Sequence, residues 1–332
     1  MIRIILLFLV ILAPPTFAQK INYQDCNQTN NLISNLYKDL FSLPPKDIST
    51  RIIFFGKQFI GKQYELGALG EGDQGYFDQY PLYRTDAFDC ETYVDTVLAL
   101  AFARNISTFQ DYIKKIRYND AHVSFIERNH FTCLDWNQNN QKQGFVKDIT
   151  STILDENHRS PAMIARAYID KPSWYQHFSQ ENIRLREPTI AEQQKRLVLL
   201  KQKGQTLPKQ YSEILYIPFT ALFDSSGNAN QQLLKQIPNG AIIEIVRPNW
   251  DLTKEIGTHL NISHLGFADW EQGTLYFLQA SSLYQRVSKT PLIDYLRQAR
   301  TSPTIKGINI QVVLDPNFPN SKTQRIKGSA LN

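Results

Sequence analysis

The chain is organised around the stretch Tyr83-Arg-Thr-Asp-Ala-Phe-Asp-Cys-Glu-Thr-Tyr-Val-Asp-Thr-Val-Leu-Ala-Leu-Ala-Phe-Ala103. Apolar residues recur in it at spacings of three and four between Val94 and Phe102, which predicts a helix with one buried face. Polar residues with N-cap character precede this run, so we expect Cys90 in the first turn of the helix. Unpaired backbone N–H groups and the positive end of the helix dipole favour a thiolate over a thiol there. Cys90 is therefore either a nucleophile or a small apolar residue packed at a helix start.

Residues 1–18 have the form of a secretory signal peptide. Arg3 is followed by an apolar run, Pro14-Pro15 ends the run, and Thr16-Phe-Ala18 offers a small-residue cleavage site. The run is too short to span a membrane, and no other stretch reaches the roughly 20 apolar residues that a span needs. We therefore expect residues 19–332 to be exported as a soluble protein, which in a bacterium usually means the periplasm.

The composition is that of an ordinary globular protein and excludes little. Hydrophobic residues make up 42% of the chain and charged residues 20%, which suffices for one large domain with a core of its own. The net charge of +5 is spread along the chain without a basic cluster, so nucleic-acid binding is not expected. The sequence gives no indication of the oligomeric state.

The order of expected elements predicts an α+β fold. Helices are expected at 31–41, 46–60 and 109–116, followed by the strands 213–219, 240–247, 261–270, 274–281 and 306–314, with a helix at 291–300. We expect the segment at about 120–212 to elaborate a single domain, residues 19–332. It should be irregular around 127–140. From 141 to about 212 it shows no strand alternation and is expected to be a mixture of short helices and loops.

The chain has three cysteines, so one thiol remains unpaired if a disulfide forms in an oxidising compartment. The economical prediction pairs Cys26 with Cys133 and leaves Cys90 free and reactive.

A cysteine nucleophile needs an imidazole to take its proton and a group that orients this imidazole. Five of the six histidines lie in polar or irregular contexts, whereas His264 lies inside an apolar strand pattern, where a histidine is costly without a partner or a task. The histidines are scattered and no cluster has ligand spacing, so no metal or other cofactor is expected.

Hairpin geometry gives His264 a partner. If the turn is centred between Glu271 and Gln272, His264 lies directly opposite Gln279, with Cβ atoms about 5 Å apart. A bulge at Gly273 would shift the register by one residue and remove this pairing. The pair is either a structural contact inside a sheet or, with Cys90, a Cys90–His264–Gln279 triad, which we favour.

Three short motifs carry a resemblance to a known family: Phe88-Asp-Cys-Glu-Thr-Tyr-Val94, Ile262-Ser-His-Leu-Gly-Phe267 and Gln279-Ala-Ser-Ser282. With the blocks 131–136 and 144–150, they make the chain from about Leu36 to Leu314 similar to the bacterial N-acetylmuramoyl-L-alanine amidase-like family. This family was long catalogued as a domain of unknown function and belongs to the NlpC-type branch of papain-like cysteine hydrolases.

The resemblance implies a papain-like fold, in which N-terminal helices carrying the nucleophile pack on an antiparallel sheet. Cys90 and His264 match the family's catalytic positions, and Gln279 stands where histidine is common, so the third residue here carries no charge. Asp89 matches the aspartate with which related peptidases hold a substrate amine. Glu91 departs from the serine that often follows the cysteine, which puts amine recognition in doubt.

These observations predict an exported cysteine amidase that hydrolyses peptidoglycan or muropeptides through a thioester. The N-acetylmuramoyl–L-alanine bond is the favoured target, and a peptide bond of the stem is the alternative. An acyltransferase or transpeptidase with the same triad and a non-catalytic envelope-binding module remain open. Tyr83 and Trp136 are candidate walls of the substrate groove.

Overall fold

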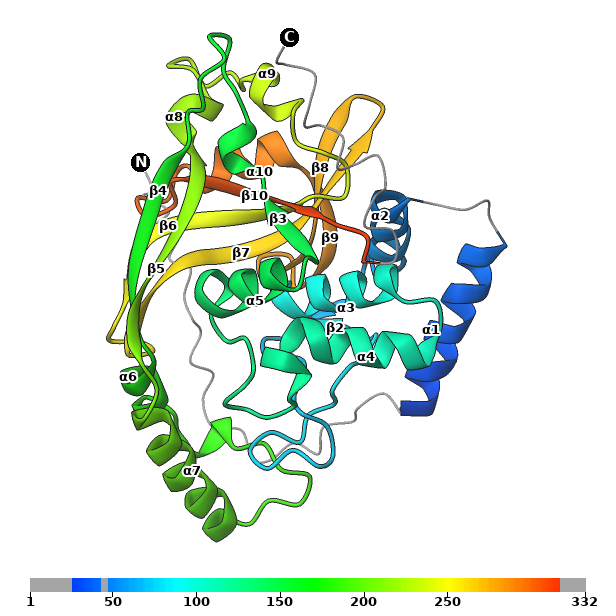
Figure 1. Ribbon diagram of the computed structural model, residues 1–332, viewed down its shortest axis with the longest axis vertical. Coiled ribbons are helices and arrows are strands. Elements are labelled where there is room, and N and C mark those ends of the chain that lie inside the picture. Colours follow the sequence, from blue (N-terminus) through cyan, green and yellow to red (C-terminus); the bar gives the residue numbers. More distant parts are fainter. Residues whose placement is uncertain (1–25, 43–46, 317–332) are drawn as a thin grey trace, which may run out of the picture.

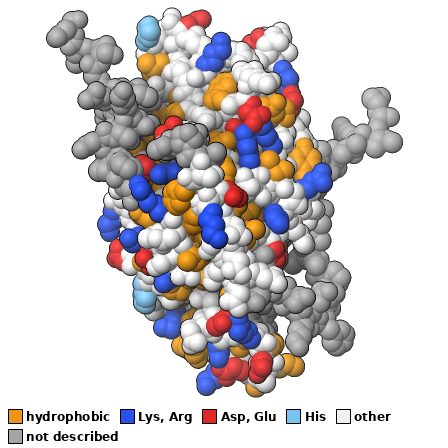
Figure 2. All heavy atoms as spheres, turned by 90° about the vertical axis from the view of Figure 1, so that its right-hand side faces the viewer, with side chains coloured by type: hydrophobic (Ala, Val, Ile, Leu, Met, Phe, Trp, Pro, Cys, Tyr) orange, Lys and Arg blue, Asp and Glu red, His pale blue; other side chains and the backbone are white. Residues whose placement is uncertain are grey.

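The computed structural model describes residues 26–42 and 47–316 and has an α+β fold, as predicted (Figure 1). The expected signal peptide at 1–18 lies outside the described residues. Five helices of the N-terminal half gather beside a large curved sheet, and a pair of later helices projects from the sheet's far end (Figure 1). In the described part of the chain, no helix is long and apolar enough to cross a membrane. On the face drawn in Figure 2, Lys and Arg are interspersed with Asp and Glu.

The helices of the described residues follow the sequence prediction in the N-terminal third of the chain. The α-helices are α1 (Cys26–Phe41), α2 (Ile48–Gln58), α3 (Cys90–Phe102), α4 (Ile106–Arg117), α5 (Asn137–Lys142), α6 (Lys171–Gln176), α7 (Ile190–Gln205), α8 (Phe219–Leu222), α9 (Gln231–Leu234) and α10 (Leu292–Ala299). A π-helical turn covers Thr132–Trp136, and single 3-10 turns cover Asn119–Ala121, Thr150–Thr152 and Gln180–Asn182.

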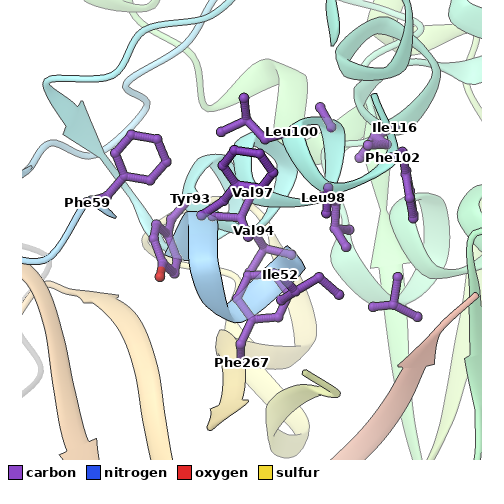
Figure 3. Packing of buried hydrophobic residues seen from close by; sticks show 14 of the residues in the cluster. Ile52, Phe59, Tyr93, Val94, Val97, Leu98, Leu100, Phe102, Ile116 and Phe267 are labelled. Atoms are coloured by element: carbon purple, nitrogen blue, oxygen red, sulfur yellow. The ribbon is translucent and has the colours of Figure 1, made fainter. Parts of the chain in front are cut away.

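Helix α3 is buried on every side, not on one face as its spacing predicts. All its residues from Thr92 to Phe102 are buried, because α2 and α4 pack on it from one side and strands of the sheet from the other. Figure 3 shows Val94, Val97 and Leu98 inside this cluster, with Phe267 of the sheet below them. A helix enclosed in this way has a fixed axis, so its N-terminal residue is held in a fixed place.

The strands form one sheet of ten, in the order β2-β1-β9-β8-β7-β6-β10-β5-β4, with β3 also paired to β10. The strands are β1 (Gln63–Tyr64), β2 (Ala87–Phe88), β3 (Val146–Asp148), β4 (Met163–Asp170), β5 (Lys209–Pro218), β6 (Ile242–Leu252), β7 (Thr258–Glu271), β8 (Thr274–Ser281), β9 (Arg286–Pro291) and β10 (Gly307–Val313). The short pair β1–β2 is parallel and the other pairs are antiparallel, so the sheet is mixed, whereas a purely antiparallel one was expected.

Strand β4 contradicts the expectation that the segment 141–212 lacks strands. Its buried residues include Ala165 and Ala167, whereas Met163 and Ile164 at the start of the strand are exposed. The sequence pattern of the strand is therefore unclear, because the buried positions hold small alanines and two exposed positions hold large apolar residues. The strand is stabilised by an unbroken ladder to β5 and by packing where the sheet curls and brings β4 against β7.

The Asn-rich segment at 127–140 is helical in its second half, not irregular as expected. Its amides satisfy carbonyl groups at the C-terminal end of α4: Asn129 and Asn140 each donate to the carbonyl oxygen of Ile116, and Asn139 donates to that of Tyr118. These carbonyls have no partner within their own helix, so buried asparagines supply one.

The predicted Cys26–Cys133 disulfide is wrong, because both thiols are free. Cys26 is exposed at the start of α1, and this helix lies on the side of the molecule opposite β4 and β5 (Figure 1). Cys133 is buried against these strands, where Ser212 donates a hydrogen bond to its sulfur at 2.6 Å.

Glu244 on β6 makes the fold sensitive to pH. Burial raises the pKa of this carboxyl to about 8, although Asn137 donates a hydrogen bond of 3.0 Å to it. In an unfolded chain a glutamate titrates near pH 4.3. Between these values the folded state holds a proton that the unfolded state has lost, so the free energy of unfolding falls as pH rises through this window.

We expect Glu244→Gln to flatten this pH dependence and to raise the free energy of unfolding at pH 8. The titration of one carboxyl accounts for at most about 1.4 kcal/mol per pH unit within the window. Urea unfolding at pH 5, 6.5 and 8 would measure it. Glu213→Gln, which removes an exposed carboxylate, is the matched control and should leave the pH slope nearly unchanged. Equal slopes for wild type and Glu244→Gln would contradict the assignment.

Candidate active site

Cys90 is the first residue of α3, as the sequence predicts, and Asp89 is its N-cap. One carboxylate oxygen of Asp89 accepts hydrogen bonds from the backbone N–H and the hydroxyl of Thr92, both at 2.8 Å. The other accepts from the backbone N–H of Gly67 at 2.8 Å. Asp89 therefore ties the helix start to the preceding loop. This use of both oxygens by the chain itself differs from the amine-binding role that the resemblance implies.

Arginines hold the loop in front of Cys90 in place. Arg117 of α4 donates to the carbonyl oxygens of Gly70 and Leu82, and Arg184 donates to that of Gly67. Arg184 also forms a buried ion pair with Asp78. Because Arg184 belongs to the elaboration, this part of the chain helps to position the loop that Asp89 binds.

The thiol of Cys90 is favoured over the thiolate, contrary to the expectation from the helix start. Burial raises its pKa, and the negative charges of Asp89 and Glu91 raise it further. The backbone N–H groups of Leu265 and Glu91 point at the sulfur and lower the pKa, but they do not offset burial. Since Leu265 follows His264 in the chain, the contact also places the sulfur beside the histidine's strand.

His264 on β7 is paired with Gln279 on β8. Its Nε2 donates to the amide oxygen of Gln279, which leaves Nδ1 with a lone pair and thus able to accept a proton. The ring stacks on Tyr295 at 6.1 Å between centroids and meets the edge of Phe277 at 5.6 Å. Burial lowers the pKa of the imidazole to about 4, so the ring is neutral at neutral pH.

The pair forms diagonally across the hairpin, so the predicted register is wrong. Gln272 and Gly273 both have positive φ, 48° and 80°, and make the two-residue turn. The ladder runs from Glu271 opposite Thr274 to Phe267 opposite Leu278, which leaves His264 two residues away from the position facing Gln279. Both side chains still share one face of the sheet, within reach of each other.

Gly266 occupies the position facing Gln279 and makes the diagonal contact possible. A Cβ atom at residue 266 would lie 3.1 Å from Cβ of Gln279 and 2.6 Å from the carbonyl oxygen of Leu278. Ser263, on the other side of His264, is an extra residue where the pairing of β6 with β7 shifts register. Such bulges redirect neighbouring side chains. The motif Ser263-His-Leu-Gly266 therefore has a geometric basis.

Two cavities adjoin these residues. One, of about 340 Å³, is lined by His264 and Gln279, and we call it the His264 cavity. The other, of about 230 Å³, is lined by Asp89 and Cys90, and we call it the Cys90 cavity. Tyr295 lines the first and lies close enough to Cys90 for a thiolate to raise the pKa of its hydroxyl. Cys90 of the second cavity thus lies near a residue that lines the first.

The Cys90 cavity contains five further titratable groups, of which the sequence analysis singled out Glu91 alone: Glu91, Asp95, Arg117, Arg128 and His130. Burial raises the pKa of Asp95 to about 7, even though Trp136 donates a hydrogen bond of 2.7 Å to it. Burial and the charge of Asp95 raise the pKa of Glu91 well above its usual range. The signal in the sequence is the spacing of Glu91 and Asp95. Two acidic residues four positions apart lie on the same face of a helix, and this helix is otherwise mostly apolar.

The predicted groove walls Tyr83 and Trp136 lie elsewhere. Trp136 is fully buried in the main core, where its indole N–H donates a hydrogen bond to Asp95. The expectation that Trp136 forms a wall of the substrate groove is therefore wrong. The hydroxyl of Tyr83 is hydrogen-bonded to Asn30 and Gln110, and Tyr83 is not among the residues that line the two cavities. Among residues 26–42 and 47–316, no group of three or more His, Cys, Asp or Glu side chains is arranged to hold a metal ion.

We expect Gly266→Ala to break the His264–Gln279 hydrogen bond, because the added methyl group displaces Gln279. Overpacking of this kind costs about 1–3 kcal/mol. The Nε2–H proton signal of His264 in NMR spectra should broaden or vanish, and the melting temperature should fall. Gly273→Ala is the matched control: it meets no atom within 4 Å but strains a positive φ, so it should lower stability and keep the signal. A retained signal in Gly266→Ala would contradict the argument.

We expect alkylation of Cys90 by iodoacetamide to be slow at pH 7 and to rise about tenfold per pH unit without a plateau through pH 9, because only the thiolate reacts and its fraction stays small below the raised pKa. Mass spectrometry of the labelled peptide, with glutathione as the reference thiol, would measure the rate. A rate that reaches its plateau below pH 8 would show instead that Cys90 and His264 form a thiolate–imidazolium pair.

Comparison with solved structures finds similar folds. A protein of Legionella pneumophila, assigned to a domain family of unknown function, is 52% identical with a TM-score of 0.84, over 87% of this chain and 95% of that one. An N-acetylmuramoyl-L-alanine amidase of Bacteroides uniformis is 22% identical with a TM-score of 0.56, over 80% of this chain and 98% of that one. No sequence among curated proteins matches the chain.

The family model described as N-acetylmuramoyl-L-alanine amidase-like matches residues 54–305. The matched range includes Cys90, His264 and Gln279, together with both cavities. This chain belongs to the N-acetylmuramoyl-L-alanine amidase-like family.

Proposed function

We propose that this chain is an exported cysteine amidase that hydrolyses an amide bond of peptidoglycan or its muropeptides, with the N-acetylmuramoyl–L-alanine bond as its first target. The observation that supports this most is the His264–Gln279 pair beside a cysteine at a helix start, within a chain of the amidase-like family. The order of nucleophile helix, histidine strand and amide strand supports a papain-like, NlpC-type assignment. Export is proposed from residues 1–18 of the sequence alone.

In the proposed mechanism, the thiol of Cys90 and the imidazole of His264 are both uncharged until substrate binds. Nδ1 of His264 takes the thiol proton as the sulfur of Cys90 attacks the amide carbon, which gives a tetrahedral intermediate with a negative oxygen. Backbone N–H groups in the first turn of α3, that of Cys90 among them, are candidate donors to this oxygen. Because the thiol pKa is high and the imidazole pKa is low, substrate has to supply the driving force for charge separation.

The second half of the proposed reaction returns the same proton. His264 passes it to the amide nitrogen, the C–N bond breaks, and the amine leaves behind a thioester on Cys90. Water, deprotonated by His264, then attacks the thioester carbon and releases the acid, while the proton returns to the sulfur. Gln279 holds the ring orientation throughout and stabilises the imidazolium through its amide oxygen, as a neutral third residue can do.

The test is mass spectrometry of purified muropeptides incubated with wild-type, Cys90→Ala and Cys26→Ser protein. We expect wild type and Cys26→Ser to release peptides that begin with L-alanine together with the free N-acetylmuramoyl sugar. We expect Cys90→Ala to release neither, because the thioester cannot form. Cys26→Ser is the control since it removes an exposed thiol remote from the site.

Other outcomes would point to the alternatives. Cleavage within the stem peptide alone would indicate an endopeptidase. Transfer of the acyl group to an added amine in preference to water would indicate an acyltransferase. Turnover that persists in Cys90→Ala would refute the assigned nucleophile, and the absence of any turnover in wild type would favour a binding module.

A further inference from the structure

The His264 cavity has the features of a binding site for one half of the substrate. Besides the catalytic pair, it is lined by Arg247, Trp250 and Ser281. Arg247 is almost fully buried, and its guanidinium lies 4.0 Å above the ring of Trp250. A guanidinium stacked on an indole has a fixed orientation and presents its N–H edge sideways.

The backbone explains why Arg247 points into this cavity. In the pairing of β6 with β7, Val246 faces Ile262 and the next pair is Trp250 with Leu260. Three residues of β6 thus lie opposite a single residue of β7, and Asn249 among them has a positive φ of 48°. Bulges of this kind beside a site re-aim side chains that a regular strand would point elsewhere.

The proposed chemistry decides which half of the substrate lies here. His264 must hand its proton to the leaving nitrogen, so the amine half has to lie on the side of the imidazole. His264 and Gln279 line the His264 cavity, whereas Asp89 and Cys90 line the other one. The amine half therefore belongs in the His264 cavity and the acyl half in the Cys90 cavity.

The two cavities are lined by different charged groups. Among the described residues that line the His264 cavity, Arg247 is the permanently charged group, and no Asp or Glu lines it. The Nε2 of Gln279, buried and without a hydrogen-bond partner, is a second donor at this cavity. The Cys90 cavity is lined by three carboxylic acids, Asp89, Glu91 and Asp95, besides two arginines. A negatively charged group on the amine half would therefore meet a guanidinium with no carboxylate beside it.

We infer that Arg247 binds a carboxylate on the amine half of the substrate, so that the enzyme selects an acidic peptide as its leaving group. The inference rests on the proposed amidase function and extends it to the specificity of the leaving-group side. Arg247 would contact the carboxylate through its N–H edge while Trp250 supports its opposite face. A charge-assisted pair in a buried place of this kind changes affinity by about 10- to 100-fold.

The test compares two substrates that differ only in the charge of the leaving group: N-acetylmuramoyl-L-alanyl-D-glutamate and its diamide. We expect wild type to cleave the acid with a kcat/KM about 10- to 100-fold higher than the diamide. Arg247→Gln should lose this preference by weakening cleavage of the acid alone, and Arg247→Lys should keep part of it. Arg166→Gln removes an exposed positive charge on β4 and is the control for net charge.

The outcomes separate this inference from the proposed function. Equal cleavage of both substrates by wild type would overturn the inference and leave the amidase standing. If neither is cleaved, the amidase proposal fails, and binding of the dipeptide L-alanyl-D-glutamate to Cys90→Ala protein by calorimetry decides the inference. Binding of the dipeptide but not its diamide would support it, and equal or absent binding would overturn it. The wild-type comparison also holds if Arg247→Gln fails to fold.

Discussion

The structure depends on the burial of α3 and on the carboxylate that caps it. A helix enclosed by other helices and by the sheet cannot tilt or slide without breaking close packing, so its first residue is fixed relative to β7. Asp89 then joins this fixed end to the preceding loop by accepting hydrogen bonds from Thr92 and Gly67. The N–H of Leu265 meets the sulfur of Cys90 because helix end and strand are both held in this way. The contacts that stabilise this part of the fold therefore also fix the position of Cys90.

The same burial sets the charge state of the proposed catalytic pair. The helix start lowers the pKa of a thiol, but it acts here on a half-buried cysteine between two acidic neighbours. Burial of the charged form outweighs a dipole effect of about 0.3–1 kcal/mol. Burial also disfavours the imidazolium, so sulfur and ring remain neutral together. A neutral amide at Gln279 is consistent with this, since an ionised third residue would add one more buried charge to the site.

The elements whose buried faces carry large apolar residues could be predicted from the sequence. The elements whose buried residues are small or polar could not. Helix α3, the strands from β5 to β8 and the helix start at Cys90 follow from hydrophobic spacing and capping residues. Strand β4 was missed because Ala165 and Ala167 give little signal on its inner face. The helical turns at 132–142 were missed because their asparagines bind backbone carbonyls of α4, a partner that spacing cannot reveal. Gln279 was identified from a strand register that is wrong by two residues. Its contact with His264 is still present, because side chains two residues apart on a strand point to the same face.

What the sequence could not predict is how charge is distributed around the site, because this depends on contacts between distant segments. Arg247 stands in a strand pattern and becomes part of a cavity only through the bulge of β6. Glu91 and Asp95 lie within an apolar helix and meet Arg117 of α4 only after folding. The two cavities thereby acquire different charged groups: three carboxylic acids and two arginines line the Cys90 cavity, whereas Arg247 and no Asp or Glu line the His264 cavity among the described residues. An amide bond has two halves, and with Cys90 as the proposed nucleophile, the different charged groups of the two cavities would distinguish the direction in which the bond lies. In the proposed enzyme, the orientation of the substrate would thus depend in part on Asp89 and Glu91, which also raise the pKa of the thiol.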